Sequence, residues 1–147
     1  MKRLWSPWRL RYITGDKPGI CVFCATAGED DDENNLILCR GKHCFVIMNR
    51  YPYNNGHLMV APYAHVNTLT SLSSQAQDEM MRLVNLCLEV LAEAMQAEGF
   101  NIGMNIGTCA GAGIKDHIHM HVVPRWSGDT NFMPVLAETH VIVEALE

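Results

Sequence analysis

The most regular pattern of apolar and polar positions lies in the segment 116–124, which reads Asp-His-Ile-His-Met-His-Val-Val-Pro. Successive side chains of a β-strand point to opposite faces of a sheet, so this period of two predicts a strand. The strand would present its histidines on one face and Ile118, Met120 and Val122 toward a core. Pro124 is expected to end the ladder, because proline has no backbone N–H to donate. The three histidines are His117, His119 and His121.

Four shorter apolar runs predict further strands, and one long run predicts a helix. From Ser74 to Glu98, apolar residues recur every three or four positions, which is the period of an amphipathic α-helix. Ser74 and Gln77 fit a capping box at its start, and Gly99 fits a C-terminal cap. The strands are expected at 36–40, 44–48, 57–61 and 101–106, with a hairpin turn at 41–43. In the last strand, the residues expected to face the core are Ile102, Met104 and Ile106.

Short connections between the strands and a single long helix predict an α+β fold with a mainly antiparallel sheet. The length of 147 residues fits one domain spanning 1–147. We expect an N-terminal arm at 1–20 with a short helix beginning at Ser6 and Pro7, a core at 21–132 and a tail at 133–147. The arm is rich in tryptophan and arginine. It either packs on the domain or on a second subunit, or it borders a phosphate-binding cleft.

The charge balance limits the partners. Eleven basic and sixteen acidic residues give a net charge of −5. A broad basic surface is therefore not expected, and neither nucleic acid nor a membrane is an expected partner. The acidic run 29–33 is expected in a solvated loop. No apolar run approaches the roughly 20 residues of a membrane span, and the N-terminus lacks a signal-peptide core. We expect a cytoplasmic protein, in which the six cysteines are reduced.

The histidine strand is the candidate reaction centre. Imidazole titrates near neutral pH, so several on one face can serve as nucleophile, acid or metal ligand. The preceding loop ends in Gly111-Ala112-Gly113, whose backbone N–H groups are not covered by bulky side chains. Such a loop can bind an oxyanion at close range, which would place phosphate donors beside an imidazole able to attack phosphorus. A metal cluster or a set of hydrogen-bonded core histidines is the alternative interpretation.

The motif His117-Ile118-His119-Met120-His121-Val122-Val123 resembles the signature of the histidine triad (HIT) superfamily. The resemblance covers residues 20–132 and implies a HIT-like fold. Within the superfamily, the chain is similar to the bacterial branch of diadenosine tetraphosphate phosphorylases and hydrolases. The other matching segments begin at Asn49, Gly56, Pro62, Asn105, Ala110 and Pro124.

The resemblance implies an enzyme that attacks the α-phosphate of a nucleotide, with dinucleoside polyphosphates as the expected substrates and an adenine nucleotide as the expected partner. The family's nucleophile corresponds to His119, which would form a covalent nucleotidyl-histidine. His121 corresponds to a residue that helps to protonate the leaving group, and His57 to a histidine near the phosphates and the triad. The residues implied in nucleotide binding are Asn49, Asn105, Gly111, Ala112, Gly113, His119 and His121.

Three other functions stay open at the level of the sequence. The enzyme could be a phosphorylase that uses inorganic phosphate, and not water, as the acceptor. The chain could be a nucleotide-binding or interaction module with incidental activity, or a metalloenzyme with its metal on the triad. Family members commonly pair through the long helix and an adjoining strand, so the resemblance also implies a homodimer.

A Cys-x-x-Cys motif at Cys21 and Cys24 forms the second cluster of candidate residues. Two cysteines so spaced are typical of zinc sites, which need two further ligands. In zinc-containing relatives that resemble galactose-1-phosphate uridylyltransferases, those ligands correspond to His65 and His117. The resemblance therefore implies a structural Zn²⁺ on four protein ligands. A redox pair and a pair of thiols without metal are the alternatives, and the other four cysteines are expected to pack in the fold.

Overall fold

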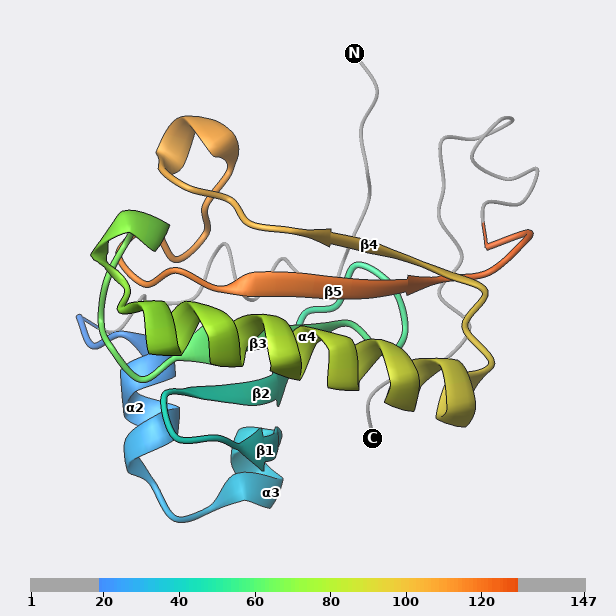
Figure 1. The fold of residues 1–147 in the computed structure, drawn as a ribbon, viewed down its shortest axis with the longest axis horizontal. Helices are drawn as coiled ribbons and strands as arrows, with labels where there is room; N and C mark the ends of the chain where they lie inside the picture. The colour runs from blue at the N-terminus through green and yellow to red at the C-terminus, as the bar shows by residue number, and fades with distance from the viewer. Residues whose placement is uncertain (1–18, 130–147) are drawn as a thin grey trace.

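The computed structural model describes residues 19–129, which are built around one five-stranded sheet in the order β1-β2-β3-β5-β4 (Figure 1). Every neighbouring pair of strands is antiparallel, so the expected α+β class with an antiparallel sheet is confirmed. The helix expected at Ser6 and Pro7 lies outside the described residues, and the division into arm, core and tail stays a prediction. The strands are β1 (Ile37–Arg40), β2 (Cys44–Met48), β3 (Leu58–Pro62), β4 (Gly99–Gly103) and β5 (Met120–Arg125).

Strand β5 contains only the last of the three histidines, so the predicted strand start at Asp116 is wrong. The ladder begins at Met120 and runs past Pro124 to Arg125, so the expectation that Pro124 ends it is also wrong; Pro124 lies opposite Phe100 of β4. Proline is tolerated there because β3 pairs with β5 only as far as Val122, so Pro124 has a strand neighbour on one side only. Ahead of the ladder, the N–H of Ile118 donates to the carbonyl of Val66 at 2.7 Å.

The predicted alternation around the histidines is confirmed despite the shorter ladder. Ile118 and Val122 are buried in the cluster that packs under helix α4 (Ser74–Met95), and Met120 packs against this cluster. His121 pairs with Met59, which contacts the cluster on the opposite face of the sheet. The histidines therefore face away from α4.

Helix α4 covers one face of the sheet (Figure 1). Its N-cap is Ser73, whose hydroxyl accepts a hydrogen bond from the N–H of Ala76 at 3.2 Å, so the predicted cap at Ser74 is wrong. Gln77 does not complete a capping box, because its side chain donates to backbone carbonyls before the helix. The helix ends at Met95, so the predicted end at Glu98 is wrong; its C-cap is Gln96, which adopts a left-handed conformation with φ 54°, and Gly99 instead begins β4.

The sheet is buried on both faces, and β2 and β3 contribute alternate residues to each side. The larger cluster lies between the sheet and α4, where the helix contributes Ala76, Met80, Leu83, Val84, Cys87 and Leu91. The smaller cluster, on the other face, consists of Phe23, Ile37, Phe45, Ile47 and Ala61. The triad histidines lie on the face of this second cluster.

Two short helices precede the sheet, α2 (Val22–Gly28) and α3 (Asp32–Asn35). The acidic run expected as a loop is partly helical, because the side chain of Asp31 caps α3. Arg40 of β1 binds Asp32 through a salt bridge of 2.7 Å and also donates to the backbone carbonyls of Ala27 in α2 and of Glu29 just after it. Two single-turn 3-10 helices are η1 (Leu69–Ser71) and η2 (Thr108–Ala110).

Strand β4 lies at one edge of the sheet and covers Gly99–Gly103, so the predicted bounds 101–106 are wrong, and the predicted core residues, two of which follow the strand, are partly wrong. Ile102 is 45% exposed and Ile106 is 42% exposed, whereas Met104 packs against the larger cluster. A strand at the edge has a neighbour on one side only, so an apolar residue there need not be covered. Within residues 19–129, no helix is both long and apolar enough to cross a membrane.

The turn between β1 and β2 is fixed from the helix above it. The carboxylate of Glu79 in α4 accepts hydrogen bonds from the backbone N–H groups of Lys42 and His43. Burial alone would raise the pKa of Glu79, but these two backbone donors together lower it below 4.5. The predicted hairpin is confirmed, and its turn is tied to the helix by a charged acceptor.

Candidate active site and metal centre

The imidazole of His119 is held in one tautomer by a backbone carbonyl. Its Nδ1 lies 2.9 Å from the carbonyl oxygen of His117, which can only accept, so Nδ1 carries the proton. The lone pair of the neutral ring is consequently on Nε2. Burial lowers the pKa of His119 below 6.5 and outweighs the hydrogen bond to His117, which favours the charged form. The neutral, nucleophilic form of His119 is therefore the main form at neutral pH.

The tautomers of His57 and His121 are fixed in the opposite sense. The backbone N–H of Tyr53 donates to Nδ1 of His57 at 3.1 Å, so the proton of the neutral His57 ring is on Nε2. That Nε2–H lies 2.9 Å from Nδ1 of His121 and donates to it. Since Nδ1 of His121 accepts, the proton of His121 is on its own Nε2. The amide of Asn49 is also directed at Nδ1 of His57, at 3.3 Å.

The rings of His119 and His121 are neighbours, with centroids 4.7 Å apart and planes inclined at 74°. One ring has a lone pair on Nε2 and the other has a proton on Nε2, as the two hydrogen-bond networks require. A basic and an acidic nitrogen side by side are suited to a displacement in which one group attacks and a leaving group is protonated.

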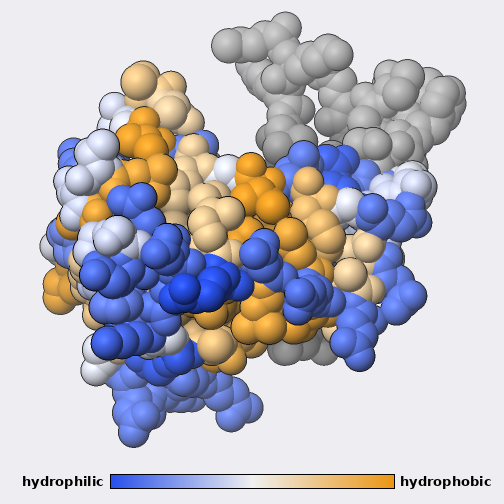
Figure 2. All heavy atoms as spheres, viewed as in Figure 1, coloured by the Kyte–Doolittle hydropathy of each residue, from blue (hydrophilic) through white to orange (hydrophobic). Residues whose placement is uncertain are grey.

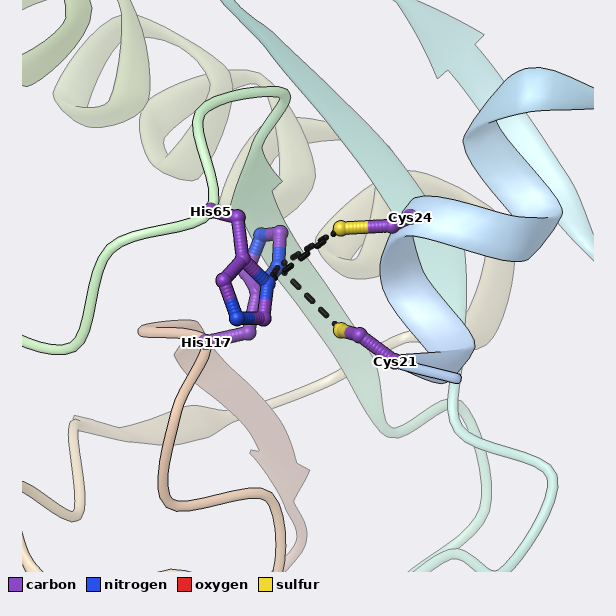
Figure 3. Close-up of side chains that lie close together, drawn as sticks. All are labelled: Cys21, Cys24, His65 and His117. Carbon is purple, nitrogen blue, oxygen red and sulfur yellow. Dashed lines mark hydrogen bonds between the residues drawn. The ribbon is translucent and has the colours of Figure 1, made fainter. Parts of the chain in front are cut away.

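The second cluster brings Cys21, Cys24, His65 and His117 together, as the family resemblance implied. Their ligand atoms all lie within 4.8 Å of one another, and the side chains converge on one point (Figure 3). Nδ1 of His117 is 3.3 Å from Sγ of Cys21, 3.5 Å from Sγ of Cys24 and 3.2 Å from Nδ1 of His65. Bond lengths of about 2.3 Å for Zn–S and about 2.0 Å for Zn–N give tetrahedral ligand separations of this size.

The chemistry of these donors also fits a cation. Nε2 of His117 donates to the carbonyl of Pro62 at 2.8 Å, which leaves the Nδ1 lone pair directed at the other ligands. Burial and the neighbouring thiol of Cys21 raise the pKa of Cys24 above 9.0, because a second thiolate nearby is unfavourable. Burial lowers the pKa of His117 below 6.5, and its ring stays neutral. A bound cation would reverse the penalty on the thiolates.

The remaining predicted binding residues lie outside these two networks. Asn105 is half-buried in the connection that follows β4. The loop after it has positive φ at Gly107 and Gly111, where glycine is favoured. The N–H groups of Gly111 and Ala112 already donate to loop carbonyls at 3.0 Å and 3.3 Å. Of the three residues expected to bind phosphate, only Gly113 keeps a backbone N–H with no acceptor among residues 19–129.

Two aromatic residues of the site were not identified from the sequence. Phe23 lies inside the Cys-x-x-Cys motif, is 1% exposed, and places its ring against both His117 and His119. Tyr53 stacks on His57 with centroids 4.9 Å apart and is itself 42% exposed. In the sequence, the position of Phe23 between two candidate metal ligands could have indicated that it belongs to the site. Tyr53 had no such indication beyond its place in a turn-rich loop.

The fold and the two networks define a class of protein: a small α+β domain in which one imidazole can attack a phosphoryl group and its neighbour can donate to the leaving group, beside a Cys/His cluster that could hold a metal ion. The chain belongs to the HIT domain family, whose model matches residues 31–128. The match includes β1 to β5 and all three triad histidines. The family assignment made from the motif is therefore confirmed.

Several known proteins are similar to this chain. The AP-4-A phosphorylase of Mycobacterium tuberculosis is 36% identical over 99% of this chain and 79% of its own length. A zinc-bound histidine triad family protein from Mycobacterium smegmatis is 31% identical, with a TM-score of 0.65 over 75% of this chain and 78% of that one. A hypothetical histidine triad nucleotide-binding protein from Sulfolobus tokodaii is 27% identical, with a TM-score of 0.66 over 74% of this chain and 71% of that one.

Proposed function

We propose that this protein is a nucleotidyl hydrolase or transferase that acts on the α-phosphate of dinucleoside polyphosphates or related adenine nucleotides. The observation that carries the proposal is the opposite protonation of two neighbouring rings. His119 has its lone pair on Nε2, and His121 has its proton there. The similarity to an AP-4-A phosphorylase over almost the whole chain supports the substrate class.

In the first step, Nε2 of His119 attacks the α-phosphorus, and a bond from nitrogen to phosphorus forms. The bond from the α-phosphorus to the bridging oxygen breaks, and its electron pair leaves with the polyphosphate. The Nε2–H of His121 donates a hydrogen bond to this oxygen, which leaves as a polyphosphate anion, and its proton is transferred only to a leaving group more basic than imidazolate, such as an amine. Nδ1 of His119 keeps its proton and donates it in a hydrogen bond to the carbonyl of His117, which stabilises the positive charge that the ring gains on nucleotide transfer.

In the second step, water or inorganic phosphate attacks the nucleotidyl-histidine, and the nitrogen–phosphorus bond breaks. The Nε2–H of His121 stays in place, and the proton of the attacking water passes to solvent. Imidazole is a good leaving group because the neutral ring is stable at neutral pH, and the lowered pKa of His119 favours this form. Water gives a nucleoside monophosphate, and phosphate gives a nucleoside diphosphate.

The substrate is held from two sides in this proposal. Asn49 binds the ribose hydroxyls, and its position beside His57 keeps the ribose near the phosphates. The N–H of Gly113 binds a non-bridging phosphate oxygen, since the two preceding amides are occupied within their loop. Asn105, which precedes the same loop, is proposed to bind the phosphates as well.

We also propose that Cys21, Cys24, His65 and His117 hold a structural Zn²⁺. The donor set, the separations and the carbonyl behind His117 support it, and one similar protein is zinc-bound. With four protein ligands, the ion would join α2 to the segment before β5 and would not act on substrate. Two thiolate ligands require a reducing compartment, so a cytoplasmic location is part of this proposal.

A homodimer through α4 and β4 is the proposed assembly. Leu86 and Val90 of α4 and Ile102 of β4 are exposed apolar residues. Figure 2 shows hydrophobic atoms gathered over the middle of α4 and onto β4. One edge of β4 has no strand neighbour in the sheet of residues 19–129, so it can pair with a second copy. Light scattering of the wild type and Val90→Glu tests the assembly, because a buried glutamate should convert a dimer to a monomer.

The test of the function is product analysis with diadenosine tetraphosphate. We expect AMP and ATP in the absence of phosphate, or ADP and ATP only when phosphate is added. Acid quenching should trap AMP on the wild-type protein, and His119→Gly should abolish both turnover and trapping. Turnover of His119→Gly near the wild-type rate would refute the proposal.

The phosphorylase is the second candidate, because the similar protein from Mycobacterium tuberculosis is an AP-4-A phosphorylase. The two candidates share the first step and differ only in the acceptor. Binding below micromolar concentration without turnover on any tested nucleotide would instead favour a binding module.

A further inference from the structure

Phe23 connects the two side-chain clusters of the site. It lies in α2 between Cys21 and Cys24, and its ring is 1% exposed. The ring centroid is 5.1 Å from that of His117 and 4.9 Å from that of His119, with interplanar angles of 49° and 46°. The one residue therefore contacts a candidate metal ligand and the proposed nucleophile at the same time.

We propose that Phe23 is a positioning residue that holds the imidazole of His119 in its attacking orientation. This proposal rests on the proposed function. The contact with His117 fixes the position of the Phe23 ring relative to the Cys/His cluster. The contact with His119 then restricts the orientation of the imidazole that is the proposed nucleophile. The Cys-x-Phe-Cys segment thus serves both the metal site and the reaction.

The hydrogen bond to His119 leaves one motion of the ring open. The bond from Nδ1 of His119 to the carbonyl of His117 fixes the tautomer, but the ring can still tilt about this bond. Phe23 lies against one side of the ring at 4.9 Å, and His121 lies at 4.7 Å with its plane inclined at 74°. Contacts from two neighbouring rings restrict the tilt, so Nε2 keeps one direction.

The position of Phe23 is itself well determined. Its ring packs edge-on against Phe45 of β2, with centroids 6.4 Å apart, within the smaller cluster. The two cysteines that flank Phe23 are held by His65 and His117 at 3.3 Å. A seven-residue helix is too short to fix a side chain alone, so these tertiary contacts are needed.

Phe45 provides a matched control. It is 0% exposed, belongs to the same cluster, and has Phe23 and Tyr63 as its ring partners. Phe23→Leu and Phe45→Leu remove the same atoms from the same core and should cost similar stability. Only Phe23→Leu removes a ring from His119. The difference between the two variants therefore isolates positioning from packing.

The experiment measures four quantities on both purified variants: zinc content, thermal midpoint, the rate of nucleotidyl-enzyme formation after rapid quenching, and kcat with KM. For Phe23→Leu we expect unchanged zinc, a KM within about twofold of wild type, and a formation rate and kcat lowered about tenfold or more. For Phe45→Leu, we expect both rates within about twofold of wild type. Phe23→Met and Phe45→Met repeat the comparison if a leucine variant does not fold.

Three results would overturn the proposal. Equal rates in the two variants would make Phe23 an ordinary core residue. A rise in KM with unchanged formation rate would assign it to substrate binding. Loss of zinc together with activity would assign it to assembly of the metal site. All three differ from a failure of the proposed function, which would appear as full activity in His119→Gly.

Discussion

Removing His57 should selectively slow reactions whose leaving group needs a proton. The imidazole of His57 is 1% exposed and donates from Nε2 to Nδ1 of His121 at 2.9 Å. This bond keeps the proton of His121 on the nitrogen proposed to act as the acid. A net hydrogen-bond energy of about 1 kcal/mol corresponds to roughly a fivefold preference for that tautomer.

The loss in His57→Ala exceeds this preference, because the ring of His121 also loses a support on one side. General acid catalysis raises reaction rates by about 10²- to 10⁴-fold. We expect His57→Ala to lose part of this acceleration, so that kcat falls roughly 10- to 100-fold. His57→Gln should retain more activity, because its amide can still donate to Nδ1 of His121. A thermal midpoint for each variant separates this effect from loss of fold.

The assay compares two substrates with the same nucleotide. An adenosine 5′-phosphoramidate releases its amine only after protonation, whereas a p-nitrophenyl ester of AMP releases a stable phenolate. His57→Ala should therefore lose at least about tenfold more activity on the phosphoramidate than on the ester. Equal losses on the two substrates, in a folded variant, would refute the assignment of His121 as the acid and of His57 as its orienting partner.

Three further predictions concern metal, helix cap and pH. Cys24→Ser should lower the zinc content measured by mass spectrometry and the thermal midpoint together, and unchanged stability after zinc loss would contradict a structural ion. Ser73→Ala should reduce the free energy of unfolding by about 1 kcal/mol in urea titrations, whereas Ser74→Ala should change it by less than about 0.5 kcal/mol. Because the pKa of Glu79 is lowered in the folded state, its contribution to stability is present above pH 4.5 and is lost as the pH falls below that value. Urea titrations between pH 7 and pH 3 should show a smaller acid-dependent loss in Glu79→Gln than in the wild type, and parallel curves would contradict the assignment.

The sequence predicted the elements whose pattern is local. Strands β1, β2 and β3 lie within one residue of their expected bounds, and α4 begins at the expected residue. The face of the histidines was predictable because Ile118 and Val122 alternate with them and are buried under α4. Periods of two and of three to four residues follow from backbone geometry and need no partner.

Positions that depend on tertiary contacts could not be predicted. Ser73 and Ser74 are equivalent as candidate caps in sequence, and only the backbone conformation distinguishes them. Gln96 ends α4 in a left-handed conformation that sequence rules assign to glycine. Ile102 has the pattern of a core residue but lies on an edge strand. The order of strands in the sheet cannot be predicted from a local sequence pattern.

The candidate site shows the same division. The family resemblance predicted the candidate metal ligands, and the structure brings their ligand atoms together. These residues are Cys21, Cys24, His65 and His117. Which ring nitrogen of each histidine carries the proton could not be predicted from the sequence. It depends on the N–H of Tyr53 and on two backbone carbonyls, those of Pro62 and His117; every residue type has a backbone carbonyl, and every type except proline has a backbone N–H, so the side-chain pattern does not reveal them.

The late start of the β5 ladder has a consequence for any attempt to stabilise or redesign the protein. Between His117 and His119, the main chain is not committed to a neighbouring strand, and one of its oxygens is available to a side chain two residues later. Extending the β5 ladder back to His117 would look like an improvement in regularity. It would draw that oxygen into the ladder and leave the Nδ1–H of His119 without its acceptor, so under the proposed mechanism a more regular sheet would make a poorer catalyst.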